Sequence, residues 1–229
     1  MDMLKEINHY REHVKKNNYV YTLQKQGINL LYEFMISLQN KQIGLGTPSK
    51  IIDYFLSVWI PRNKRYLTEA EAFNIVYTLQ DFQTYLEERS EDKKDFPLVL
   101  DLYRKDYVRL YRAKKLIDEM VGNPIISTNP IVIDLENYKG HKEKKQRKDT
   151  MCMYEQGIFR IEEVNKEGYL GLVKLNSKKH CKVLCRPTLL YHFKEEDLMQ
   201  IHLKKKIFFI YWEIEELKAY YPSRAIEYL

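Results

Sequence analysis

The period of the hydrophobic pattern changes once along this chain, between residues 121 and 151, and this change constrains the fold more than any other feature. Up to residue 121, apolar residues recur at spacings of three and four, which is the pattern of amphipathic helices. After residue 150, apolar and polar residues alternate in short runs separated by turn residues, which is the pattern of half-buried strands. We therefore expect an α+β protein in which helices come first and antiparallel strands follow.

Three regions follow from this pattern. We predict a helical bundle over residues 1–121, a linker over 122–150 and a small antiparallel β-barrel over 151–229 that ends in a helix. The linker is expected because this stretch contains two Asn-Pro turns followed by a run of basic residues. The barrel, SH3-like or OB-like, is expected because short strands joined by tight turns avoid exposed sheet edges by closing.

The helical part has two well-marked helix starts. Thr47 followed by Pro48 is an N-cap before a proline at the first helical position. Thr68 and Glu71 form a capping box, in which each side chain accepts the other residue's backbone amide. Pro61 is expected to end the helix that starts at Thr47, because proline lacks the amide hydrogen that a helix interior needs. The expected helices lie near 3–16, near 18–40, from 47 to 61, from 68 onward and near 92–121.

The second part of the chain predicts four or five strands. "IFFIYW" (207–212) is a candidate fifth strand, and "IVIDL" in the linker is a candidate additional one. The tail that begins at Glu213 is predicted to be a broken helix that folds back. The four clearer strands are expected at 157–164, 168–175, 179–186 and in "LMQIHL".

The positive charge of the chain is concentrated in one short segment. The net charge is +6, and residues 139–148 ("KGHKEKKQRK") alone contribute +5. Residues 151–229 contribute +2 and the remaining residues −1, so both folded parts are nearly neutral. A basic segment of this kind can neutralise the phosphates of a nucleic acid. A solvated linker between domains is the alternative interpretation.

Composition gives no indication of a membrane or secreted protein. No apolar run approaches the roughly 20 residues of a membrane span. The N-terminus lacks the apolar stretch and the cleavage site of a signal peptide. The three cysteines are an odd number, which argues against a disulfide framework. We therefore expect a cytoplasmic protein with no membrane role.

Metal-binding residue types occur in two places, and neither predicts a metal site. "HYREH" at 9–13 matches the His-x-x-Glu-His zinc signature, but no third ligand is identifiable, so we interpret it as a solvated helix face. Cys181 and Cys185 would lie about 13 Å apart on an extended strand, too far to share one Zn²⁺, and are interpreted as buried thiols. No nucleophile elbow, phosphate-binding loop or dinucleotide fingerprint occurs. We predict no catalytic site, no metal and no cofactor.

Three groups of basic residues are candidate contacts to phosphate. The first is the loop "RNKR" between the third and fourth expected helices, with Arg62, Lys64 and Arg65. The second lies within about 60° on the wheel of the fifth helix, with Lys105, Arg109 and Arg112. Asp101, one turn before Lys105, is an alternative partner for that lysine. The third is the basic segment, with Lys142, Lys144, Lys145, Arg147 and Lys148.

Residues 18–90 resemble the N-terminal, SAM-like core-binding domain of tyrosine recombinases and phage integrases. The resemblance rests on the apolar spacing of "LLYEFMISLQNKQ" and "TPSKIIDYFLSVWIPRNKRYLTEAEAFNIVYTLQDFQTYLEE". The resemblance implies that these helices bind DNA mainly through its backbone, with phosphate contacts from Arg62, Lys64 and Arg65. The second half has three arginines and no His-x-x-Arg box, so a recombinase is not expected. The whole chain also resembles a bacterial family with a helical front and a barrel behind.

Two functions from different classes remain open. The first is a non-catalytic nucleic-acid-binding or accessory protein, in which the bundle and linker contact the DNA backbone and the barrel offers a second surface. The second is a protein-interaction or regulatory module that docks a protein partner through "IFFIYW" and "YYPSRAIEYL", if these are exposed. Basic residues that form one uninterrupted face would favour the first function, and acidic residues within that face would disfavour it.

Overall fold

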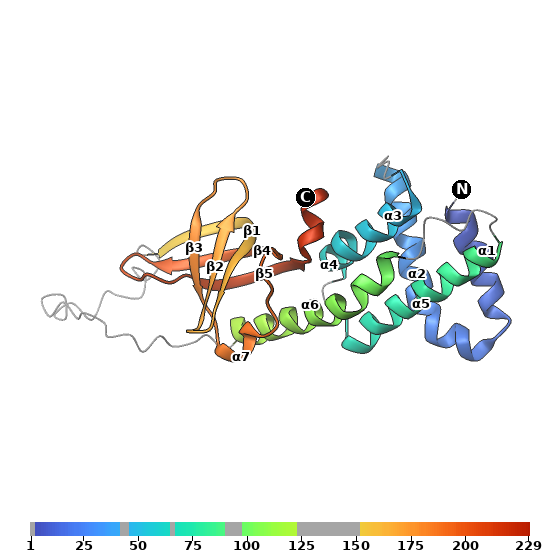
Figure 1. The fold of residues 1–229 in the computed structure, drawn as a ribbon, viewed down its shortest axis with the longest axis horizontal. Coiled ribbons are helices and arrows are strands. Elements are labelled where there is room, and N and C mark those ends of the chain that lie inside the picture. Colours follow the sequence, from blue (N-terminus) through green and yellow to red (C-terminus); the bar gives the residue numbers. More distant parts are fainter. Residues whose placement is uncertain (1–2, 42–45, 65–66, 90–97, 123–151) are drawn as a thin grey trace, which may run out of the picture. The chain divides into compact units, whose positions relative to one another are not determined.

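The chain divides into two compact units in the computed structural model, which describes residues 3–41, 46–64, 67–89, 98–122 and 152–229. The helical unit comprises Met1–Arg112 and Tyr221–Leu229, and the sheet unit comprises Ala113–Tyr220. Figure 1 labels the α-helices and strands of both. Among the helices in the described ranges, none combines the length and the apolar character that a membrane crossing requires.

Both predicted helix starts of the helical unit are confirmed. The Thr47 hydroxyl accepts the amide of Lys50 at 3.5 Å. The capping box forms in both directions, at 2.6 Å from the Thr68 amide to Glu71 and at 3.2 Å from the Glu71 amide to Thr68. The elements of this unit are α1 (Met3–Lys15), α2 (Asn18–Lys41), α3 (Pro48–Tyr54), the π-helical turn η1 (Phe55–Trp59), α4 (Ile60–Asn63), α5 (Glu69–Arg89) and the first part of α6 (Leu98–Gly122).

The prediction that Pro61 ends the third helix is wrong. The chain stays helical through Asn63 because the preceding turn, η1, is wider than an α-helical turn. In it the amide of Ile60 donates to the carbonyl of Phe55, five residues earlier. Pro61 then lies in the first turn of α4, where a missing amide hydrogen is tolerated.

Aromatic rings fill much of the core of the helical unit. The ring of Phe34 lies 4.9 Å from that of Phe55 and 5.6 Å from that of Trp59, which joins α2 to η1. Tyr10 is buried, and its hydroxyl lies 2.7 Å from Asp81 Oδ2, which joins α1 to α5. These contacts tie together helices that are far apart in the sequence.

The C-terminal segment packs back onto the helical unit. It contains the 3₁₀ helix η3 (Ser223–Glu227), which is all that the structure retains of the predicted C-terminal helix. The hydroxyl of Tyr228 donates to Asp53 Oδ2 at 2.7 Å, and its ring meets that of Tyr54 edge to face at 5.4 Å. The chain end is thus held by α3.

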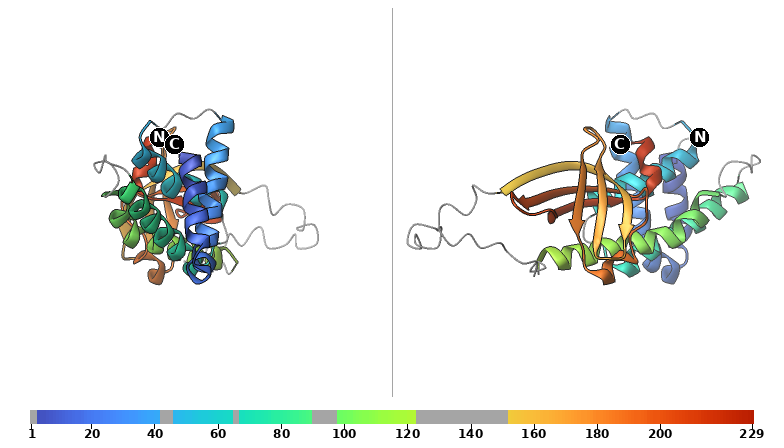
Figure 2. Two further views of the ribbon diagram at one scale, coloured as in Figure 1. Left: turned by 90° about the vertical axis from the view of Figure 1, so that its right-hand side faces the viewer. Right: turned by 60° about the vertical axis from the view of Figure 1, so that its left-hand side comes forward.

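The sheet unit contains one five-stranded antiparallel sheet in the spatial order β3-β2-β1-β4-β5. Strand β1 is the long central strand, and a bulge between Ile161 and Glu163 interrupts its register with β2. Bulges bend a strand, and Figure 2 shows that β1 curves along its length. The elements are β1 (Cys152–Asn165), β2 (Tyr169–Lys174), β3 (His180–Leu184), the short helix α7 (Pro187–Leu190), β4 (Leu198–Lys206) and β5 (Glu213–Tyr221).

An additional bridge involves both edge strands. Val183 in β3 pairs in parallel with Trp212, the residue directly before β5. The amide of Leu184 donates to the Trp212 carbonyl at 2.9 Å, and the Trp212 amide donates to the Lys182 carbonyl at 2.8 Å. The start of one edge strand is therefore hydrogen-bonded to the other edge strand.

The four clear strand predictions are confirmed within a few residues, but the end of the chain is corrected in two places. Residues 213–221 form strand β5 and not a helix, because pairing beside β4 outweighs the helix propensity of a Glu- and Leu-rich segment. "IFFIYW" is mostly a turn between β4 and β5, and only Trp212 takes part in a bridge. The candidate strand "IVIDL" lies outside the described residues.

Candidate functional site

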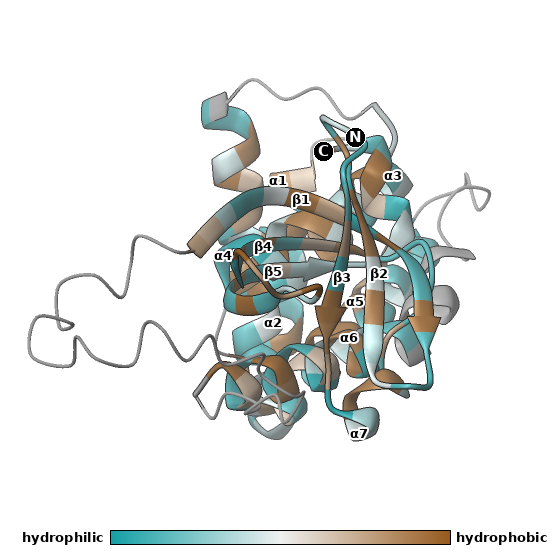
Figure 3. Cartoon of the chain, turned by 90° about the vertical axis from the view of Figure 1, so that its left-hand side faces the viewer, coloured by the Kyte–Doolittle hydropathy of each residue, from teal (hydrophilic) through white to brown (hydrophobic). Residues whose placement is uncertain are grey.

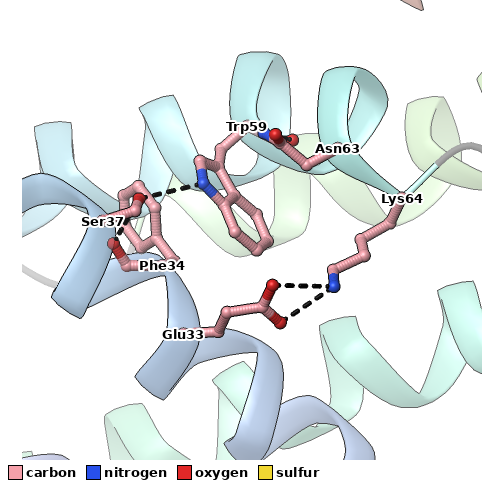
Figure 4. A network of polar contacts seen from close by, with 6 residues as sticks. All are labelled: Glu33, Phe34, Ser37, Trp59, Asn63 and Lys64. Atoms are coloured by element: carbon pink, nitrogen blue, oxygen red, sulfur yellow. Dashed lines mark hydrogen bonds and ion pairs between the residues drawn. The ribbon is translucent and has the colours of Figure 1, made fainter.

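The loop predicted to contact phosphate is a packed corner whose lysine is already paired. Figure 4 shows Lys64 Nζ between the two carboxylate oxygens of Glu33, at 2.8 and 2.9 Å. The same ammonium lies 5.7 Å from the centre of the Trp59 ring, and the Trp59 indole donates to Ser37 at 3.1 Å. Glu33 belongs to α2, so the loop is joined to the helix beside it. Arg65 lies outside the described residues.

Arg62, the remaining cation of that loop, interacts with the C-terminal segment. The guanidinium of Arg62 forms a side-chain hydrogen bond with the hydroxyl of Tyr221. Burial raises the pKa of Tyr221, and the bond from Arg62 opposes that rise. Arg62 is therefore engaged within the helical unit and does not stand alone in solvent.

The basic face predicted on the fifth helix is interrupted by carboxylates. Arg109 lies 3.5 Å from Asp106, one turn earlier in α6. Arg112 is paired with Glu69 at the start of α5. The side chain of Lys105 lies outside the described residues. The arrangement that would have favoured phosphate binding by the helical unit is therefore not observed in the described side chains.

A different set of basic residues gathers in the sheet unit, at what we call the lysine-rich end. Strand register places the start of β1 beside the end of β4, with Cys152 opposite Lys206 and Tyr154 opposite Lys204. Glu155, near the start of β1, contacts both Lys174 at the end of β2 and Lys179 just before β3. The lysine-rich end consists of Lys174, Lys178, Lys179, Lys204, Lys205 and Lys206.

The sheet unit is electrostatically polarised, although its net charge is small. Three glutamates accompany the six lysines at the lysine-rich end, namely Glu155, Glu213 and Glu215. At the other end of the sheet, the turn between β1 and β2 and the segment before β4 are mainly acidic. Their charged residues are Lys166, Glu167, Lys194, Glu195, Glu196 and Asp197, and they adjoin Arg160, which is ion-paired with Glu196, and Arg186, which follows Cys185 beside the turn. The near-neutral sum over residues 151–229 conceals this separation.

Aromatic rings lie against most of the cations at the lysine-rich end. Trp212 has two ammonium groups near its ring, those of Lys179 at 5.3 Å and Lys205 at 5.2 Å. Lys204 lies 5.5 Å from the ring of Tyr154, whose hydrogen bond raises the pKa of that lysine. Cation–π contacts hold the lysines in place without neutralising them, because the rings have no net charge. A further contact of this type joins Lys206 to Phe209 at 5.1 Å.

One carboxylate partly offsets this charge. Hydrogen bonds from Lys174 and then from Lys179 lower the pKa of Glu155, so the group is ionised at neutral pH. It is mostly buried beneath the two ammonium groups. The lysines of β4 have their ring contacts instead, and they lie on the strand beside Glu155.

The turn between β4 and β5 exposes apolar side chains beside these lysines. We call residues 207–210 the apolar turn, and Figure 3 draws it as a brown segment between the two strands. Phe208 is 85% exposed, Ile210 75% and Ile207 47%. Such a concentration of exposed apolar groups indicates a binding surface when it is contiguous.

A second aromatic and basic group lies on the outer side of β2 and β3. Lys182 Nζ lies 5.0 Å from the ring of Tyr169, and that ring lies 5.9 Å from the ring of Tyr211. The Tyr169 hydroxyl donates to Glu163 at 3.2 Å. Tyr169 begins β2 beside the turn between β1 and β2, so this group lies toward the other end of the sheet from the lysine-rich end.

Within the described ranges, no group of three His, Cys, Asp or Glu side chains could hold a metal ion. His13 packs against the ring of Tyr85 at 5.1 Å, and Glu12 pairs with Lys15. Cys181 in β3 and Cys185 directly after β3 are both buried, and burial raises the pKa of Cys185 to about 12. These thiols are protonated core groups.

The basic segment of the linker lies outside the described residues, and with it Lys142, Lys144, Lys145, Arg147 and Lys148. The sequence interpretation overlooked the lysine-rich end, because its members come from three separate stretches. One signal was present: "KKKIFFIYW" places three lysines directly before an apolar and aromatic run.

No family model, no curated protein and no solved structure matches this chain.

Proposed function

We propose that this protein is a non-catalytic nucleic-acid-binding protein whose lysine-rich end contacts the phosphate backbone. The observation that supports this best is the gathering of six lysines at one end of the sheet unit, where the three lysines at the end of β4, Lys204, Lys205 and Lys206, are held by rings that leave their charge intact. Phosphate contacts need cations that are not already neutralised by carboxylates. The basic segment at 139–148 is the proposed second contributor, since it precedes β1 in the sequence by only a few residues.

The sheet is proposed to be an OB-like barrel. Three observations support this topology. The strand order is β3-β2-β1-β4-β5, a short helix lies between β3 and β4, and the residue before β5 bridges in parallel to β3. The bend in β1 at its bulge would bring the two edges toward each other. OB folds bind oligonucleotides through one strand face and two loops.

The helical unit is proposed to be an accessory element with a SAM-like arrangement of helices. Its cations at positions 62, 64, 109 and 112 are each engaged by another side chain. We therefore assign it a small share of the binding energy. Its resemblance to the core-binding domain of recombinases concerns the spacing of apolar residues and not a set of free cations.

A salt titration tests the proposal. Binding to a random-sequence nucleic acid is measured for the wild-type chain, for Lys204→Gln/Lys205→Gln/Lys206→Gln and for the control Lys166→Gln/Lys194→Gln/Lys218→Gln. Both variants remove three positive charges from the sheet unit, but only the first removes them from the lysine-rich end. We expect the first to lose about tenfold or more in affinity, and its salt dependence to become shallower by about 2–3 in log–log slope. The control should change little.

Three outcomes would redirect the proposal. Equal losses in the two variants would mean that net charge matters and the lysine-rich end does not. Loss of binding only when residues 139–148 are neutralised would assign the function to that segment. No binding at about 50 mM salt, where backbone contacts are strongest, would exclude nucleic acid. The apolar turn would then favour the second candidate, a module that docks a protein partner.

A further inference from the structure

We infer that the apolar turn selects single-stranded nucleic acid, with Phe208 stacking on an unpaired base beside the lysine-rich end. This inference rests on the proposed function and names the class of ligand. The lysines alone would bind any phosphate backbone, whether paired or unpaired. Phe208, next to these lysines, is the side chain that would distinguish an unpaired strand from a duplex.

The apolar turn leaves the ring of Phe208 in solvent. The amide of Phe209 donates to the Lys206 carbonyl at 3.0 Å, which closes the turn directly after β4. Phe209 is half-buried and its ring is covered by the ammonium group of Lys206. Phe208, the residue before it, is 85% exposed. It is one of the most exposed large apolar side chains among the described residues.

An exposed phenyl ring among lysines matches the chemistry of an unpaired strand. Bases in a duplex are stacked on one another, and their faces are not available to a side chain unless the duplex is distorted. Every base in a single strand has an available face, and stacking on an aromatic ring tolerates any sequence. The adjoining Ile207 and Ile210 would cover the edges of the stacked base and exclude water from it.

Other occupants fit the surface less well. Protein interfaces are depleted in lysine and enriched in arginine, whereas this end contains six lysines and no arginine. An anionic lipid surface shares the preference for lysine beside apolar side chains. It would, however, not require the aromatic ring at position 208, since an aliphatic side chain buries comparably.

The test compares Phe208→Ser, Phe208→Leu and Phe208→Tyr with the control Tyr191→Ser. Tyr191 is 86% exposed, follows α7 and lies outside the lysine-rich end, so its loss removes an equally exposed ring. Binding of oligothymidylate of about 20 nucleotides, longer than the about 4–16 that one OB fold covers, is measured beside a duplex of the same length. A strand containing 2-aminopurine reports stacking through its fluorescence.

We expect the wild-type chain to bind the single strand more tightly than the duplex. Phe208→Ser and Phe208→Leu should lower single-strand affinity about fivefold to a hundredfold, while duplex affinity and salt dependence stay unchanged. Phe208→Tyr should retain both the affinity and the 2-aminopurine signal. Tyr191→Ser should behave as wild type.

Each alternative has its own signature. If the wild-type chain binds neither form, the proposed function fails, and the inference fails with it. If it binds both forms and the Phe208 variants bind as wild type, only the inference is overturned. If the Phe208 variants bind nucleic acid normally but Phe208→Ser no longer binds vesicles of anionic phospholipid, the apolar turn is a lipid contact, and the inference is also overturned.

Discussion

The two basic regions of this protein differ in what their cations touch. In the helical unit, Lys64 is held by both oxygens of Glu33, and Arg112 in α6 is held by Glu69 in α5. At the lysine-rich end of the sheet unit, Lys204 and Lys205 lie against the rings of Tyr154 and Trp212. A carboxylate cancels a positive charge, whereas a ring positions it and leaves it in the surrounding field.

This difference shows that the density of basic residues in a sequence is a poor measure of positive potential. "RNKR" is the denser cluster, but an ion pair at the protein surface contributes little to stability and removes a charge that could attract phosphate. Lys174 in β2 and Lys204 in β4 are thirty residues apart in the sequence, and they come to the same end of the sheet because both strands pair with β1. The predictions below test whether this contrast decides binding, and they begin with the largest expected effect.

The first prediction concerns Trp212, the ring that two lysines share. It is 3% exposed, and its backbone bridges to β3. Trp212→Ala should lower the free energy of unfolding by about 3–5 kcal/mol, because it removes a large buried side chain. Urea denaturation would measure this loss. The neighbouring Tyr211→Ala is the control and should cost clearly less, since Tyr211 is only half-buried. A loss below about 1 kcal/mol for Trp212→Ala would contradict the packing described here.

Those parts of the fold that depend on local contacts could be predicted from the sequence. Caps at Thr47 and Thr68 act through residues three positions apart, so the sequence alone was sufficient to predict them. The change of period near residue 150 was equally local and correctly separated helices from strands. Strand β5 was not predicted, because its conformation is decided by pairing beside β4, which local propensity does not contain.

The site was harder to predict for the same reason. Glu155, Lys174 and Lys179 come together only once the register of β1, β2 and β3 is known. The carboxylate that neutralises Lys64 belongs to α2, about thirty residues earlier in the chain. Charge summed over a segment cannot show which cations are paired, and it therefore gave the helical corner more weight than the structure supports.

The second prediction removes the one carboxylate that holds two lysines. Glu155→Gln should raise affinity for nucleic acid about two- to tenfold at low salt and steepen the salt dependence, because Lys174 and Lys179 regain an uncompensated charge. Anisotropy titrations at several salt concentrations would measure both quantities. The matched variant at the helical corner, Glu33→Gln, should leave affinity unchanged. An equal gain in the two variants would remove the distinction between the regions.

The third prediction follows from the lowered pKa of Glu155. Hydrogen bonds from Lys174 and Lys179 depress this pKa below the usual value near 4.5. A depressed pKa means that the stabilisation is present above the pKa of the unfolded chain and is lost as pH falls through the lower pKa of the folded chain. The difference in unfolding free energy between wild type and Glu155→Gln should therefore be constant near neutrality and shrink below about pH 4.5. A difference that instead grew on acidification would refute the assignment.

The fourth prediction concerns the ion pair between Lys64 and Glu33, whose loss should have the smallest effect on stability. Glu33→Gln removes the partner of Lys64, and both side chains are partly exposed. Exposed ion pairs contribute about 0–1 kcal/mol, so the midpoint of urea unfolding should move only slightly. The ammonium of Lys64 would keep its position over the Trp59 ring, and the Trp59 indole would keep its bond to Ser37. A loss well above 1 kcal/mol would mean that the corner depends on its charges. The small loss that we expect would instead show that aromatic packing of Phe34, Phe55 and Trp59 holds it.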